Sequence, residues 1–90
     1  MKQILIVDDE RITLRALQEE FTEAGYEVTA VTDGETASTL IGKKHYDLVL
    51  LDMQLPRKSG MEVLKECRKL APDTIVLMIA AYASVETAVM

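Results

Sequence analysis

Three aspartates in this sequence each follow a short apolar run, a position from which a carboxylate can do chemistry. Asp8 and Asp9 come after Ile4-Leu5-Ile6-Val7, and Asp52 comes after Leu48-Val49-Leu50-Leu51. An aspartate at the end of a buried strand can be a solvated loop acid, a metal ligand or a nucleophile. The elements around these residues must decide among the three.

Each acid also has an ordinary structural interpretation when taken alone. Asp8, Asp9 and Glu10 can cap a helix and favour its first turn, and Asp52 can be a solvated acid in a loop. A chemical role becomes the better interpretation only if the two segments bring their acids to one place.

Four segments have the pattern of β-strands. Residues 4–7, 48–51 and 75–79 are continuous apolar runs, which are typical of strands covered on both faces. Residues 27–31 alternate and are half polar, which favours a strand at the edge of a sheet. We therefore expect three central strands and one edge strand.

Helical patterns lie between these strands. Apolar residues recur three or four apart in two segments, at Leu14, Leu17, Phe21 and Ala24, and at Val63 or Leu64, Cys67 and Leu70. End signals accompany the helices: Gly25 and Gly42 as C-terminal caps, Asp33 and Ser84 as N-caps, and Ser59 with Glu62 as a capping box.

The alternation of strand and helix predicts an α/β fold with a parallel, doubly wound, flavodoxin-like sheet. If the half-polar second strand is the edge and the first lies beside it, the order is 2-1-3-4. Ligands bind such sheets outside the carboxyl ends of strands one and three, where Asp8, Asp9 and Asp52 would meet on strands about 4.8 Å apart. Three like charges there favour a bound cation, and carboxylate oxygens suit Mg²⁺.

Three stretches of the chain resemble the receiver domain of two-component response regulators. They are ILIVDDE at 4–10, DLVLLDMQLPRKSGMEVL at 47–64 and AYASVETAV at 81–89, so the resemblance runs from end to end. The last stretch is most similar to receivers attached to sigma-54-dependent transcription activators.

The resemblance implies a phosphoacceptor signalling domain rather than an enzyme acting on an outside substrate. Asp52 would accept the phosphoryl group, Asp9 would bind Mg²⁺ directly, Asp8 would act through water, and the backbone carbonyl of Gln54 would be a further ligand. The donor would be a phosphohistidine on a sensor histidine kinase, with small acyl phosphates as substitutes. An effector domain would convert the signal into transcriptional regulation.

The sequence departs from the family pattern near its C-terminal end. Ala80 stands where the family has the Ser or Thr that bonds the phosphoryl group, and Tyr82 is the nearby candidate for a side chain that reorients in signalling. The family's lysine, fifth strand and fifth helix would lie beyond Met90. We therefore expect residues 1–90 to be one receiver domain, incomplete at its C-terminus, and to form a homo-oligomer through the exposed edge of the last strand.

Composition limits the other possibilities. The chain has 90 residues with a net charge of −5 and a pI of about 4.8, which disfavours direct binding to nucleic acid or to an anionic membrane. Its single cysteine, Cys67, excludes an internal disulfide, and neither a signal sequence nor a membrane-length apolar run is evident. We expect a cytoplasmic protein.

Two other functions stay open. A phosphatase with an aspartyl nucleophile is disfavoured because the acids after the first strand are adjacent rather than separated by one residue. A receiver-like interaction module that no longer switches is favoured by Ala80 and by the missing lysine.

Overall fold

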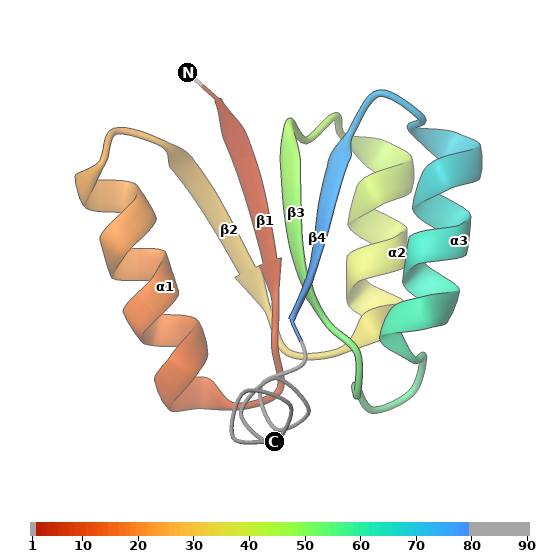
Figure 1. Ribbon diagram of the computed structural model, residues 1–90, viewed down its shortest axis with the longest axis horizontal. Coiled ribbons are helices and arrows are strands. Elements are labelled where there is room, and N and C mark those ends of the chain that lie inside the picture. Colours follow the sequence, from red (N-terminus) through yellow and green to blue (C-terminus); the bar gives the residue numbers. More distant parts are fainter. Residues whose placement is uncertain (1, 80–90) are drawn as a thin grey trace, which may run out of the picture.

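The computed structural model describes residues 2–79, which form four strands and three helices in alternation (Figure 1). In chain order they are β1 (Gln3–Val7), α1 (Arg11–Glu23), β2 (Glu27–Val31), α2 (Gly34–Lys43), β3 (Leu48–Asp52), α3 (Gly60–Leu70) and β4 (Ile75–Ile79).

The strands form one parallel sheet in the order β2-β1-β3-β4, as predicted. In the register between the two inner strands, Val7 pairs with Leu51. Asp8 follows Val7 in the chain and Asp52 follows Leu51, so these two acids lie at the same level of the sheet. The parallel register thus decides that the two acidic segments meet.

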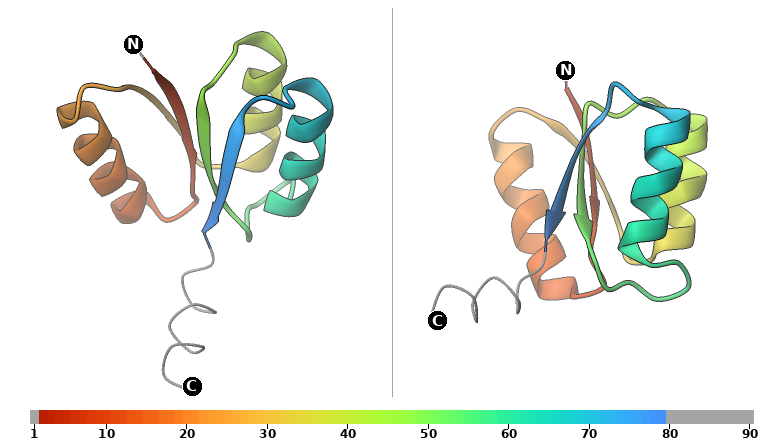
Figure 2. Two further views of the ribbon diagram at one scale, coloured as in Figure 1. Left: turned by 45° about the horizontal axis from the view of Figure 1, so that its top comes forward. Right: turned by 45° about the vertical axis from the view of Figure 1, so that its right-hand side comes forward.

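Both faces of the inner strands are buried, as continuous apolar runs require. Leu5, Val7, Val49 and Leu51 pack against α2 and α3 in one cluster, whereas Ile4, Ile6 and Leu50 pack against α1 in the other. Figures 1 and 2 show α1 on one side of the sheet and α2 with α3 on the other. Cys67 belongs to the α2 and α3 side and is buried, as expected for a packing residue.

Most predicted helix ends are confirmed. Asp33 caps α2, the Ser59–Glu62 capping box begins α3, and Gly25 follows α1 with a φ of 98°. The prediction that Gly42 caps the C-terminus of α2 was wrong, because α2 continues to Lys43. The chain then leaves the helix at Lys44 with extended backbone. An extended exit needs no left-handed residue and therefore no glycine.

The two outer strands differ in their cover. β2 is an edge, as its half-polar sequence predicted. The prediction that residues 75–79 form a central strand was wrong for the sheet that residues 2–79 make, because β4 is its other edge. Ile75 and Leu77 of β4 are 62% and 52% exposed. Leu70, at the end of α3, is also mainly exposed, so the apolar face of this helix is shorter than predicted.

No helix within residues 2–79 is long and apolar enough to cross a membrane. The fourth helical pattern and its predicted cap, Ser84, lie outside the described residues.

The position of Gly42 gives a first prediction. A Cβ there would meet nothing within 4 Å, and the residue is exposed inside α2. Gly42→Ala should therefore raise the free energy of unfolding by about 0.5–1 kcal/mol, because alanine restricts the unfolded chain and favours helix. Urea denaturation followed by circular dichroism measures this, and a loss of stability would show that the helix does not continue through residue 42.

Candidate functional site

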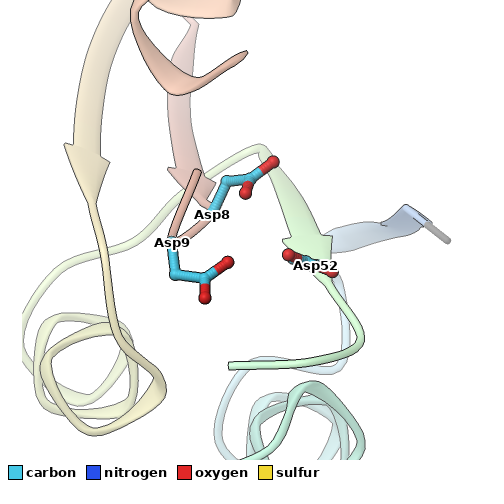
Figure 3. Close-up of side chains that lie close together, drawn as sticks. All are labelled: Asp8, Asp9 and Asp52. Carbon is cyan, nitrogen blue, oxygen red and sulfur yellow. The ribbon is translucent and has the colours of Figure 1, made fainter. Parts of the chain in front are cut away.

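The three predicted aspartates converge at the carboxyl end of the sheet. One carboxylate oxygen from each of Asp8, Asp9 and Asp52 lies within 4.8 Å of the others. Figure 3 shows Asp8 and Asp9 coming from the end of β1 and Asp52 from the end of β3. The acids are therefore one cluster rather than two unrelated helix caps or loop acids.

Asp8 is the buried member of the cluster, and its position is fixed from two directions. Its backbone N–H donates to the carbonyl of Val31 over 3.1 Å, which extends the pairing with β2 by one residue. Its side-chain Oδ1 accepts the N–H of Glu10 over 2.9 Å, and only 4% of the residue is exposed. Asp8 is thus held in the sheet and has little freedom to turn toward water.

Glu10 fulfils the ordinary structural role that was considered for all the acids after β1. It is the N-cap of α1, and its Oε1 accepts the N–H of Ile12 over 3.3 Å. Because Glu10 caps the helix, Asp9 is not needed for that task and lies exposed beside Asp8.

Asp52 is the last residue of β3 and is half-buried. The strand end is anchored beyond it, since the N–H of Met53 donates to the carbonyl of Ile79 over 3.2 Å. The Oδ1 of Asp52 accepts the N–H of Gln54 over 3.2 Å. This bond orients the carboxylate and leaves Oδ2 as its freer oxygen.

The cluster is electrostatically unfavourable when its members are ionised. Burial raises the pKa of Asp8 above its ordinary value; the N–H of Glu10 opposes this rise, and the carboxylates of Asp52 and Asp9 add to it. Desolvation and like charge both disfavour the ionised form.

The donor set fits a hard divalent cation. The cluster offers carboxylate oxygens alone, which magnesium and calcium prefer over the nitrogen and sulfur ligands suited to zinc or copper. Burial is the main cause of the raised pKa of Asp8, and a cation among the carboxylates would offset both the loss of hydration and the repulsion that adds to it. The charge of the cluster and its oxygen chemistry thus point to the same kind of ligand.

The geometry gives Gly60 a role that the sequence did not. Gly60 is buried at the start of α3, and its N–H donates to the carbonyl of Met53 over 3.0 Å. A Cβ at this position would overlap the carbonyl oxygen of Asp52 and lie 2.8 Å from the Cα of Met53. Only glycine allows the helix to begin this close to the candidate nucleophile. The position of Gly60 in the L-P-x-x-x-G stretch was the sequence signal that could have indicated this role.

The remaining predicted site residues fall in two places. The backbone N–H of Gln54 donates to Asp52, and the side chain of Gln54 is exposed. Ala80 and Tyr82, the predicted switch positions, lie outside the described residues.

Comparison with known proteins shows which family this chain resembles. The sequence pattern of the response regulator receiver domain matches residues 4–90. The regulatory protein AtoC of Escherichia coli (strain K12) is 42% identical over 89 residues, which are 99% of this chain and 19% of AtoC. The chain therefore spans about a fifth of the length of that curated relative.

Solved structures show the same fold. The response regulator TrrA of Thermotoga maritima, in complex with Mg²⁺-BeF, has a TM-score of 0.86 and 40% identity, covering 97% of this chain and 76% of that one. A structure of histidine kinase ThkA in complex with TrrA has a TM-score of 0.83 and 43% identity, covering 91% of this chain and 71% of that one.

The crowding of the acids predicts that Asp8→Asn stabilises the chain in the absence of metal. The amide keeps an acceptor for the N–H of Glu10 but carries no charge, so at pH 7 the free energy of unfolding should rise by about 1 kcal/mol. Folding raises the pKa of Asp8. The stability that this group contributes is therefore present below pH 3.8 and is lost as the pH rises through the pKa of the folded state.

The gain from Asp8→Asn should therefore shrink as the pH falls toward 3.8, the ordinary value for aspartate. Urea denaturation at a series of pH values measures it, with Asp73→Asn in an exposed turn as the matched control. Equal stabilities of wild type and Asp8→Asn at pH 7 would contradict the prediction.

Proposed function

The chain belongs to the response regulator receiver family, and we propose on that premise that Asp52 accepts a phosphoryl group in a Mg²⁺-dependent transfer. The observation that carries the proposal is the convergence of Asp8, Asp9 and Asp52 within 4.8 Å at the carboxyl end of the sheet. A lone carboxylate would repel an incoming phosphoryl group, whereas one that shares a cation with its neighbours can approach it.

Asp52 is the nucleophile of the proposed reaction. Since its Oδ1 accepts the N–H of Gln54, we assign the attack to Oδ2. An electron pair of this oxygen forms the new O–P bond. At the same time the bond between phosphorus and the leaving group breaks, which is a P–N bond in a phosphohistidine and a P–O bond in an acyl phosphate. The leaving group keeps the electron pair of the broken bond. The product is an aspartyl phosphate.

The other acids hold the cation. Exposed Asp9 would be a direct ligand and buried Asp8, with one oxygen bound to Glu10, would act through water, while Asp52 and the carbonyl of Gln54 would complete the protein's contribution. When bound, Mg²⁺ neutralises charge on the carboxylates and on the phosphoryl oxygens. The similarity to TrrA, which was solved with Mg²⁺-BeF, supports this assignment.

A sensor histidine kinase is the proposed donor, and transcriptional regulation the proposed output. The first rests on the similarity to TrrA in its complex with histidine kinase ThkA. The second rests on the similarity to larger regulators such as AtoC, of which this chain spans 19%. Both assignments concern the whole protein rather than the site itself.

A second candidate is a receiver-like interaction module whose switching is impaired. The observation that favours it is Ala80, which lacks the hydroxyl of the Ser or Thr that the family places there. A hydrogen bond to a charged acceptor contributes roughly 1.5–3 kcal/mol, so its loss would weaken the coupling between phosphorylation and conformation. Phosphorylation of Asp52 would then occur with a blunted response.

The phosphoacceptor role predicts a covalent adduct. Incubation with acetyl phosphate and Mg²⁺ should add about 80 Da, the mass of one phosphoryl group, and the adduct should be labile because it is an acyl phosphate. Intact-mass spectrometry measures it. Asp52→Asn should abolish the adduct, and Asp73→Asn, at the opposite end of the sheet, should retain it.

Two results would decide against the role of Asp52, and one would decide against the role of Mg²⁺. An adduct that persists in Asp52→Asn would place the phosphoryl group elsewhere, and an adduct that forms equally well without Mg²⁺ would remove the cation from the mechanism. Catalytic turnover of an outside phosphate ester would instead favour the phosphatase.

We also propose that a second copy of the chain pairs with β4 and forms a homo-oligomer. β4 is at the edge of the sheet formed by residues 2–79, and Ile75 and Leu77 expose more than half of their surface. An apolar strand at a sheet edge readily pairs with another strand, which satisfies its backbone groups and covers its side chains.

The expected behaviour is concentration-dependent dimerisation or higher association in sedimentation velocity. Leu77→Lys should shift the chain toward monomer by placing a charge at the edge. Ile12→Lys is the matched control, because Ile12 is also an exposed apolar residue, at 80%, but lies on α1. A wild-type chain that stays monomeric at high micromolar concentration would contradict the proposal.

A further inference from the structure

The loop that follows Asp52 contains a tight turn that holds its backbone in a strained conformation. The N–H of Lys58 donates to the carbonyl of Pro56 over 2.8 Å, and Arg57 between them has a φ of 71°. A positive φ is disfavoured for a residue that has a Cβ, and three-residue turns of this kind are rare. Contacts outside the turn must therefore keep it in place.

Gly34, the first residue of α2, contacts the turn through its backbone. Its N–H donates to the carbonyl of Pro56 over 3.4 Å, the same oxygen that accepts from Lys58. A Cβ on Gly34 would overlap the carbonyl oxygen of Lys58 and lie 2.8 Å from the carbonyl carbon. The start of α2 can reach the turn only because residue 34 has no side chain.

Charged side chains of the turn interact with residues of the neighbouring elements. The Nζ of Lys58 lies 2.6 Å from the Oε2 of Glu66 on α3. On the α2 side, the backbone N–H of Thr36 chiefly lowers the pKa of Asp33, and the charge of Arg57 lowers it further. Lys58 thus forms an ion pair with α3, and the charge of Arg57 acts on the N-cap residue of α2.

The turn is coupled to the acidic cluster by a short piece of chain. Met53, Gln54 and Leu55 connect Asp52 to Pro56, and Gly60 holds the carbonyl of Met53 from the other side. A shift of the turn would therefore move the N–H of Gln54, which orients Asp52, together with the Gln54 carbonyl.

We propose that Gly34 is a positioning residue for the phosphoryl-transfer site: its contact with the turn at 56–58 holds Asp52 and the Gln54 carbonyl in the arrangement that Mg²⁺ requires. The inference rests on the proposed function, since it assigns a cause to the geometry of that site. Gly34 contacts neither cation nor phosphoryl group and acts only through the loop. Residues that orient metal ligands from outside typically change metal affinity by about 10- to 100-fold when they are altered.

The test compares two glycines of the same helix. Gly34→Ala should weaken Mg²⁺ binding by about tenfold in isothermal titration calorimetry. Gly42→Ala adds the same methyl group to α2 where nothing lies within 4 Å, and its Mg²⁺ affinity should stay within about twofold of wild type. A residue that only stabilised the fold would lower the unfolding temperature without changing the affinity of the folded chain.

Amide hydrogen exchange without metal supplies an independent readout. In Gly34→Ala, the amides of Lys58 and Gly60 should exchange at least about tenfold faster, whereas the amides of β1 should keep their protection. Gly42→Ala should not speed the exchange of either set of amides.

Glu66→Gln keeps the inference testable if Gly34→Ala fails to fold. It removes only the charged partner of Lys58, so a smaller loss of Mg²⁺ affinity is expected, about threefold, because the pair is partly exposed. Glu23→Gln, at the far end of α1, removes the same charge and should bind Mg²⁺ like wild type.

The inference is overturned if loop amides or Mg²⁺ affinity in folded Gly34→Ala match those of Gly42→Ala. Should Gly34→Ala not fold, equal affinities of Glu66→Gln and Glu23→Gln overturn it instead. A wild-type chain that binds no Mg²⁺ overturns the proposed function, and with it the purpose assigned to Gly34, even if the exchange data show that Gly34 holds the loop.

Discussion

The structure depends on one constraint: parallel pairing of β1 with β3 holds carboxylates together against their mutual repulsion. Val7 pairs with Leu51, so Asp8 and Asp52 stand side by side, and burial of the apolar residues below them prevents the register from slipping. A shift by one residue would turn every buried side chain to the opposite face. The packing of the core therefore provides the free energy that keeps the acids close.

The environment of the cluster is arranged differently for each acid. Asp8 is buried and bonded to the N–H of Glu10, Asp9 is exposed, and Asp52 is half-buried with one oxygen bonded to Gln54. In the proposed phosphoryl transfer, these differences would separate the cation ligands from the nucleophile. Burial and the neighbouring carboxylates raise the pKa of Asp8, and a bound cation would oppose this rise.

The predicted fold agrees with the observed one because the order of polar and apolar residues along each segment indicates directly which faces are buried. Apolar runs and a half-polar strand predicted the strand order, and Ser59 with Glu62 predicted the start of α3, because these signals act within a few residues. The prediction for Gly42 failed because a glycine inside a helix and a glycine after one look alike in sequence. The exit of the chain from α2, which is extended at Lys44, distinguished them.

By itself, the sequence determined which residues could carry chemistry and at which end of the sheet they would lie, since residue type and alternation of elements suffice for that. Only the tertiary structure decided that Glu10 caps α1 and frees Asp9, that Gly60 approaches Asp52, and that Gly34 approaches the turn at 56–58. The cap at Glu10 is a local contact, but Asp8, Asp9 and Glu10 were all able to make it, so their sequence did not choose among them. For the two glycines, the physical reason is that the contacts join segments separated in the chain, at distances where one methyl group is too large. No local pattern of residues records whether that space exists.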